Sequence, residues 1–180
     1  MTNNLNKVSA RQMSSSDCFV CGAANNLGFR AQFYEMDNGE LISLVKPKFE
    51  YQSYPERLHG GIAATLLDET MGRAIMINNP DTWGVTIDME TKFIKPVPLN
   101  QTLRVIGYIT SDRRIFTAEG RILLEDGTEA VTAKARYLKM PVNKISEGVN
   151  NTSDILFMTD EEKDIDYISS EGELIIKYKE

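Results

Sequence analysis

The sequence predicts an α+β domain in which an antiparallel sheet packs against one long helix. Apolar and polar residues alternate over several short segments, as they do in strands with one buried face. Two glycine-containing turns, Asp37-Asn38-Gly39 and Asp126-Gly127, join neighbouring segments as hairpins. One long stretch, 59–77, has the residue spacing of a helix. The predicted order along the chain is therefore β-β-α-β-β-β-β.

The first two strands are expected near 29–36 and 40–47, on either side of the first turn. An aromatic and polar loop at 49–58 then leads to the helix. The helix is expected to stop at Asn78-Asn79-Pro80-Asp81, because the residue before a proline disfavours helical backbone angles.

Four further strands are expected after the helix, at 85–90, 103–110, 115–125 and 128–140. The second glycine turn joins the last two. Because hairpins rather than helical crossovers connect these strands, we expect the sheet to be antiparallel.

Charge divides the chain into a neutral body and an acidic C-terminal segment. Residues 141–180 contain 4 lysines and 10 acidic residues, which accounts for the whole net charge of −6. A neutral body lacks the basic face that nucleic acid or an anionic membrane surface requires, so neither partner is expected. No apolar run approaches the ~20 residues that span a bilayer, and residues 1–17 lack a secretion signal, so we expect a cytoplasmic protein.

Three parts follow from these patterns: a polar N-terminal extension at 1–17, a folded domain at 18–140 and an acidic C-terminal extension at 141–180. The last part also contains the apolar clusters 155–158 and 174–176, and this apolar content is too high for a wholly disordered tail. It is expected to dock either on its own domain or on a neighbouring subunit.

The two cysteines form a Cys18-Phe-Val-Cys21-Gly22 sequence, which is the spacing of half a zinc knuckle. A closed zinc site needs four ligands, and the chain has one histidine. A site shared between two subunits could supply four thiolates, which is a less favoured alternative. A redox pair is a further alternative, but no βαβ unit surrounds the motif. We therefore expect a tight loop with partly buried thiols, and no metal or separate cofactor.

Two adjacent acids, Asp68 and Glu69, lie inside the otherwise apolar predicted helix. Glu69 has Arg73 four residues later, which favours a helical ion pair. Asp68 has no cation within helical reach and shares a stripe of small residues with Gly61 and Gly72. Because an unpaired buried carboxylate is costly for folding, Asp68 is the better candidate for catalysis.

The helix is expected to begin at Gly60-Gly61, immediately after His59. Glycine amides at a helix start are unobstructed and can donate to a developing oxyanion, while His59 can orient the turn through its backbone contacts. An amide donor and an acid on one helix can polarise a carbonyl and activate water beside it.

The stretch from His59 to Glu69, His-Gly-Gly-Ile-Ala-Ala-Thr-Leu-Leu-Asp-Glu, resembles the central-helix motif of the hotdog-fold acyl-CoA thioesterases of the phenylacetic-acid-degradation (PaaI-like) type. The segments 51–55, 84–89 and 93–98 and the cysteine motif are similar to the same branch. The resemblance covers roughly residues 18–139 and implies a helix wrapped by an antiparallel sheet.

The resemblance also implies the roles of individual residues. Asp68 is expected to attack the thioester or activate water, and the amide of Gly60 or Gly61 to polarise its carbonyl. Thr86, presented by a partner subunit, is expected to help hold that water or the acid. The coenzyme A of the substrate and the acyl group are expected to contact His59, Gln52, Glu69, Phe93, Lys95, Pro96, Arg113 and Arg114. Hotdog subunits join their sheets edge to edge, so a dimer or a dimer of dimers is expected.

Two rival functions remain open. One is hydration or dehydration of enoyl-thioesters, which usually combines a catalytic histidine with an acid, and here the only histidine is at the helix start. The other is a module that binds acyl-CoA without cleaving it. An unpaired acid near the carbonyl favours hydrolysis of acyl-CoA to a free acid and coenzyme A over both rivals.

Overall fold

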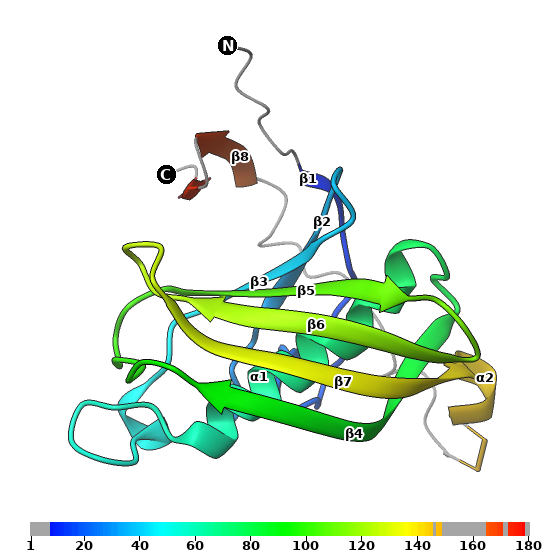
Figure 1. Ribbon diagram of the computed structural model, residues 1–180, viewed down its shortest axis with the longest axis horizontal. Coiled ribbons are helices and arrows are strands. Elements are labelled where there is room, and N and C mark those ends of the chain that lie inside the picture. The colour runs from blue at the N-terminus through cyan, green and yellow to red at the C-terminus, as the bar shows by residue number, and fades with distance from the viewer. Residues whose placement is uncertain (1–7, 146, 149–164, 171–172, 179–180) are drawn as a thin grey trace.

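A computed structural model describes residues 8–145, 147–148, 165–170 and 173–178 of the chain. Its main feature is a seven-stranded antiparallel sheet in the order β1-β2-β3-β5-β6-β7-β4. The strands are β1 (Val8–Arg11), β2 (Gln32–Met36), β3 (Leu41–Val45), β4 (Thr82–Phe93), β5 (Leu103–Ser111), β6 (Ile115–Leu123) and β7 (Glu129–Pro141). The sheet curves around the helix α1 (Gly60–Arg73), which lies behind β5, β6, β7 and β4 in Figure 1.

The sequence prediction of the architecture is confirmed: an antiparallel sheet packs on one long helix, and six of the strands lie where alternation placed them. The glycines of the two predicted hairpin turns, Gly39 and Gly127, have φ angles of +82° and +84°. Only glycine adopts such angles without strain, which explains why each turn carries one.

The helix packs very closely on the sheet. Leu67 and Met71 have no exposed surface, and Ala74 and Ile75 are 1% exposed, so the sheet fully covers this apolar face of the helix. A Cβ atom at Gly120 of β6 would lie 2.8 Å from Cγ of Met71. The sheet thus has glycine where α1 packs against it. This close packing sets the position of α1 on the sheet.

The predicted helix at 59–77 ends in a different geometry. The α-helix stops at Arg73, and the 3₁₀ helix η2 (Ala74–Ile77) completes the segment before Asn78. A second 3₁₀ helix, η1 (Phe49–Tyr51), lies in the loop that precedes α1. Tightened last turns of this kind are common where a helix gives way to a loop.

The sheet extends further toward the N-terminus than the expected domain boundary at residue 18. Strand β1 pairs with β2, with Arg11 opposite Tyr34, and the backbone N–H of Gln12 continues the pairing to the carbonyl of Phe33. The polar composition of 1–17 hid this strand, because an edge strand needs only one apolar face.

Strand β4 is longer than the predicted 85–90 and more exposed than a half-covered strand. It ends the sheet, so one of its edges has no neighbour in the described chain. Val85 is 42% exposed and Ile87 is 47% exposed. Alternation predicted the strand, but alternation does not tell whether a strand lies at the centre or the edge of a sheet.

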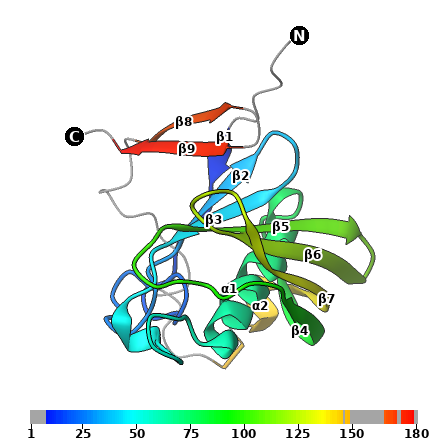
Figure 2. The same ribbon diagram turned by 60° about the vertical axis from the view of Figure 1, so that its left-hand side comes forward.

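The C-terminal segment contains the short helix α2 (Val142–Ile145) and a two-stranded sheet of β8 (Ile165–Ser170) and β9 (Glu173–Tyr178), visible in Figure 2. The apolar cluster 174–176 belongs to β9, whereas the cluster 155–158 lies outside the described residues. Within the described part of the chain, no helix is long and apolar enough to cross a membrane.

Candidate active site

Asp68 lies two turns into α1, half-buried, with its side chain toward β4 and β7. Its Oδ1 atom accepts hydrogen bonds from the hydroxyl of Thr86, at 2.9 Å, and from the hydroxyl of Tyr137, at 3.2 Å. The Tyr137 hydroxyl also lies 3.1 Å from the backbone carbonyl of Asp68. Hydrogen bonds to a charged group stabilise by roughly 1.5–3 kcal/mol, so these two hydroxyls hold the carboxylate firmly.

The two hydroxyls come from adjacent strands. Thr86 of β4 is directly opposite Tyr137 of β7, and the next pair in register is Asp88 with Arg136. Ile87 is therefore an extra residue, a bulge in β4. Bulges redirect side chains next to many functional sites, and here Thr86 sits at the bulge and faces Asp68.

A cavity of about 240 Å³ opens beside Asp68. Its lining comes from the N-terminal loop, from α1 and η2 and from the start of β4: Ser15, Cys18, Cys21, Asp68, Glu69, Gly72, Arg73, Met76, Trp83, Gly84 and Thr86. No Lys or Arg of the described residues forms an ion pair with Asp68. The expectation of an acid in a pocket without a cation partner is thus confirmed.

Glu69 has the partner that the sequence assigned to it. Its Oε1 lies 2.8 Å from Nε of Arg73, which is itself buried at 9% exposure. Arg73 also donates to the carbonyl of Met13 and stacks over the ring of Phe33. Arg73 is therefore committed to Glu69 and the N-terminal segment, and it leaves Asp68 without a counter-charge although both line the cavity.

The cysteine loop forms one wall of the same cavity. A hydrogen bond with Cys21 lowers the pKa of Cys18 to about 6, against the opposing effect of burial. The same bond, together with burial, raises the pKa of Cys21. The expectation of a tight loop with partly buried thiols is met, since Cys21 is buried and the Gly22 N–H donates to the Cys18 carbonyl at 2.8 Å.

At the start of α1, His59 is the N-cap and its Nδ1 accepts the N–H of Gly61 at 3.0 Å. The predicted orienting role of His59 is therefore seen in the structure, and it uses the Gly61 amide. The N–H of Gly60 has no acceptor among the described residues. Of the two glycines named from the sequence, Gly60 is therefore the one whose backbone N–H can donate to a substrate.

The Gly60 amide and Asp68 do not face a common cleft within one chain. Eight residues separate them along α1, a rise of about 12 Å at 1.5 Å per residue. Gly60 lies instead beside the ring of Phe93, where a Cβ atom would be 3.2 Å from the ring. The expectation that one helix brings both groups to one carbonyl is wrong for the single chain, because the helix holds them more than two turns apart.

The structure also differs from the expected origin of Thr86. The resemblance implied that a partner subunit presents this hydroxyl to the acid, whereas Thr86 contacts Asp68 of its own chain. The reason is that α1 packs on β4 of the same chain, at the point where Gly72 and Gly84 allow close approach.

The residues expected to contact substrate divide between two ends of the sheet. Phe93, Lys95 and Pro96 are exposed at the far end of β4, near the start of α1. Arg113 and Arg114 are exposed in the turn between β5 and β6, near the start of β4, since Arg114 bonds to Lys139 and Lys139 is opposite Gly84. One chain therefore does not assemble these candidates into one binding surface.

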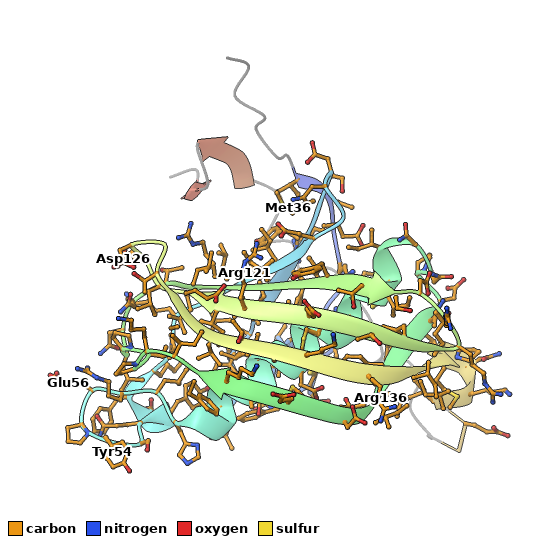
Figure 3. The ribbon with its side chains drawn as sticks, viewed as in Figure 1. Met36, Tyr54, Glu56, Arg121, Asp126 and Arg136 are labelled. Carbon is orange, nitrogen blue, oxygen red and sulfur yellow. The ribbon has the colours of Figure 1, made fainter. Side chains whose placement is uncertain are left out.

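Gln52 lies in the loop before α1, from which Tyr54 and Glu56 project at one end of the molecule (Figure 3). Its side-chain oxygen accepts the backbone N–H of Glu56 at 2.7 Å. Gln52 thus shapes the approach to the helix start, and its carbonyl oxygen is already engaged there.

The sequence did not predict two residues of the site, Tyr137 and Trp83. Tyr137 is fully buried, and burial followed by the charge of Asp68 raises its pKa, so it is a neutral donor. Strand alternation places Tyr137 on the inner face of the sheet. Nothing in the sequence tells whether this tyrosine donates a hydrogen bond at the site or only packs in the core. Trp83 lines the cavity, and its indole N–H is buried without an acceptor in the described part of the chain.

Comparison with known proteins places this site in context. Residues 56–131 match the model of the thioesterase superfamily. The mouse (Mus musculus) acyl-coenzyme A thioesterase THEM4 is 26% identical over 136 residues, which are 74% of this chain and 58% of the mouse protein. The chain thus spans less than two thirds of that relative.

Solved structures show the same fold. The crystal structure of a thioesterase superfamily protein superposes with a TM-score of 0.64 at 27% identity, over 73% of this chain and 68% of that chain. A Streptococcus mutans protein, crystallised with acetyl CoA, superposes with a TM-score of 0.52 at 21% identity, over 57% of this chain and 82% of its own. The family match at 56–131 includes α1 and β4, which carry Asp68 and Thr86.

Proposed function

We propose that this chain, which has the hotdog fold and matches the thioesterase superfamily model at 56–131, hydrolyses acyl-CoA thioesters to a free acid and coenzyme A. The observation that carries this proposal is Asp68, a carboxylate held by two hydroxyls at a cavity and paired with no cation. The thioesterase name of the mouse relative and the acetyl CoA of the Streptococcus mutans protein support the substrate class.

Asp68 acts as a general base in this proposal. Both hydroxyl bonds go to Oδ1, whereas Oδ2 accepts no hydrogen bond from the described residues. Oδ2 can therefore take a proton from a water molecule as its oxygen adds to the thioester carbonyl carbon. The C–S bond then breaks, and the proton passes from Asp68 to the departing sulfur of coenzyme A.

The oxyanion of this reaction needs a donor that one chain does not place beside Asp68. We assign that role to the Gly60 amide of a second copy. Strand β4 has an open edge of 12 residues, long enough to pair with the same edge of another chain. Antiparallel pairing about the middle of β4 sets the Thr86 end of one copy against the Phe93 end of the other.

This pairing would assemble two equivalent sites from the separated halves. Asp68 contacts Thr86, and Gly60 contacts Phe93, so each half is attached to one end of β4. The same operation brings Arg113 and Arg114 of one copy toward Lys95 of the other, as a set of cations for the phosphates of coenzyme A. A homodimer is therefore the smallest assembly with a complete site in this proposal.

Enoyl-thioester hydration is disfavoured by the position of the histidine. That chemistry usually needs a catalytic histidine, and His59, the single histidine of the chain, already uses its Nδ1 to accept the Gly61 N–H as the cap of α1. A module that binds without cleaving has no use for the hydroxyl-held acid.

The test is release of free thiol from a panel of acyl-CoAs by the wild-type chain and by Asp68→Asn. We expect the variant to lose at least about 10²-fold in kcat, because it cannot accept the proton. Glu125→Gln, an exposed change in the β6–β7 turn, is the matched control and should keep full activity. Binding of acyl-CoA by calorimetry with no thiol release by the wild-type chain would establish the binding module instead.

A further inference from the structure

Three side chains that the proposed hydrolysis does not use converge at the cavity wall. The Sγ atoms of Cys18 and Cys21 and a carboxylate oxygen of Glu69 all lie within 4.8 Å of one another, and Cys18 Sγ is 4.0 Å from Glu69 Oε1. Ligand atoms of a tetrahedral zinc ion are about 3.5 Å apart, given bonds of about 2.0–2.3 Å. Rotamer changes that move these atoms by less than about 1 Å would therefore close such a site.

Backbone and guanidinium N–H groups point at both sulfurs. Cys18 Sγ accepts the backbone N–H groups of Val20 and Cys21, each at 3.3 Å. Cys21 Sγ accepts the N–H of Ser15 at 3.5 Å and a guanidinium N–H of Arg73 at 3.2 Å. Four N–H groups thus point at the two sulfurs and can serve as outer hydrogen-bond donors to sulfur ligands of a metal ion.

The backbone holds the two cysteines in this arrangement. A Cβ atom at Gly22 would lie 2.3 Å from the carbonyl oxygen of Cys18, so only glycine fits directly after Cys21. Glu69 is fixed on α1, which the glycines of the sheet hold in place. The three donors thus come from two rigid segments, the N-terminal loop and the helix.

Arg73 is the obvious objection, because its cation already contacts Cys21 and Glu69. Two thiolates, a carboxylate and a divalent ion have a net charge of −1, which one guanidinium neutralises. Arg73 is anchored independently, by the carbonyl of Met13 at 3.0 Å and by the ring of Phe33, 4.6 Å from its Cζ. It can therefore keep its place as an outer hydrogen-bond donor to the ligands, as such sites commonly require.

We propose that Cys18, Cys21 and Glu69 bind one zinc ion, with the fourth position open to the cavity beside Asp68. A water molecule from the cavity can complete the tetrahedron, since the space of about 240 Å³ exceeds the volume of one water. The ion would tie the N-terminal loop to α1 next to Asp68. The count of two cysteines and one histidine predicts no closed zinc site, whereas the fold adds Glu69 as a third ligand.

The test uses cobalt(II) as a spectroscopic probe in the full chain, prepared with a chelator and titrated without oxygen in a non-thiol reductant. We expect a near-ultraviolet thiolate-to-cobalt charge-transfer band and visible tetrahedral bands that saturate at one cobalt per chain. Zinc should displace cobalt and remove both sets of bands. Cys18→Ser and Cys21→Ser should each lose most of the charge-transfer intensity, and Glu69→Gln should weaken cobalt binding about ten-fold or more.

Circular dichroism of each variant without metal checks that it folds, and Glu125→Gln is the control for a removed carboxylate. Absence of the charge-transfer band at saturating cobalt overturns the proposal, as does air oxidation to a Cys18–Cys21 disulfide in a chain without metal affinity. Unchanged cobalt affinity in Glu69→Gln would equally overturn the three-ligand site. The readout is metal binding, so the result does not depend on whether the chain hydrolyses thioesters.

Discussion

At the scale of single residues, the two neighbouring acids of α1 are held in different ways. Glu69 is paired with Arg73, whereas Asp68 receives only neutral hydroxyl donors and lines the same cavity. Helical spacing was enough to predict this division, because an ion pair four residues apart can be read directly from the sequence. The contact of the Tyr137 hydroxyl with Asp68 could not be predicted from sequence spacing, because it depends on the register between β4 and β7.

Removal of either hydroxyl should slow hydrolysis while the fold survives. Thr86→Val and Tyr137→Phe each delete one hydrogen bond to the Asp68 carboxylate, worth roughly 1.5–3 kcal/mol, so kcat should fall about 10- to 100-fold. Steady-state kinetics and thermal unfolding measure the two effects separately.

The matched controls are Thr110→Val and Tyr108→Phe, which remove hydroxyls elsewhere on the sheet. They should leave kcat unchanged. If Thr86→Val and Tyr137→Phe were as active as these controls, the hydroxyls would have only a structural role at Asp68.

At the scale of elements, the start of α1 is built to present a single amide. His59 has an extended backbone, with φ −64° and ψ 133°, and its side chain takes the Gly61 N–H, so the Gly60 N–H is left over. The sequence predicted the helix start and the capping histidine, but it could not tell the two glycines apart. That distinction depends on the tautomer and orientation of one imidazole ring.

Gly60→Pro tests this amide with little disturbance of the helix. Proline is favoured at the first helical position, and the extended backbone of His59 suits a following proline. The substitution removes one N–H, and we expect kcat to fall about 10²- to 10³-fold, as for loss of an oxyanion donor.

Gly60→Ala is the control, because it adds the same Cβ atom beside Phe93 but keeps the N–H. It should retain most of the activity. Equal activity of the proline and alanine variants would remove the Gly60 amide from the reaction.

At the scale of the whole molecule, one chain contains two half-sites and an open sheet edge. The order of the strands places β4 last, and this order could not be read from alternation or hairpin turns alone. Figure 1 shows β4 along the lower border of the sheet, where β7 is its one neighbour among the described strands. Gly60 and Asp68 lie apart within one chain. The edge of β4 is the place where a second copy can bind and complete each site.

A charge at the middle of that edge should separate the copies. Ile87 is 47% exposed in the single chain, and Ile87→Lys would place an ammonium group where two β4 edges meet. We expect the variant to sediment as a monomer and to lose thioester hydrolysis, with an unchanged circular dichroism spectrum. Leu27→Lys, at a 78% exposed position outside the sheet, should keep both the assembly and the activity. A monomeric variant with full activity would contradict a shared site.

Mixing two inactive variants shows whether one site takes its acid and its amide from different copies. Asp68→Asn and Gly60→Pro are unfolded and refolded together in equal amounts, and native mass spectrometry verifies that mixed dimers form. If each site takes its acid from one copy and its amide from the other, each mixed dimer regains one intact site, and activity should return to roughly a quarter of the wild-type value. Mixed dimers that release no thiol would contradict the account, because they would show that Asp68 and Gly60 must belong to the same chain.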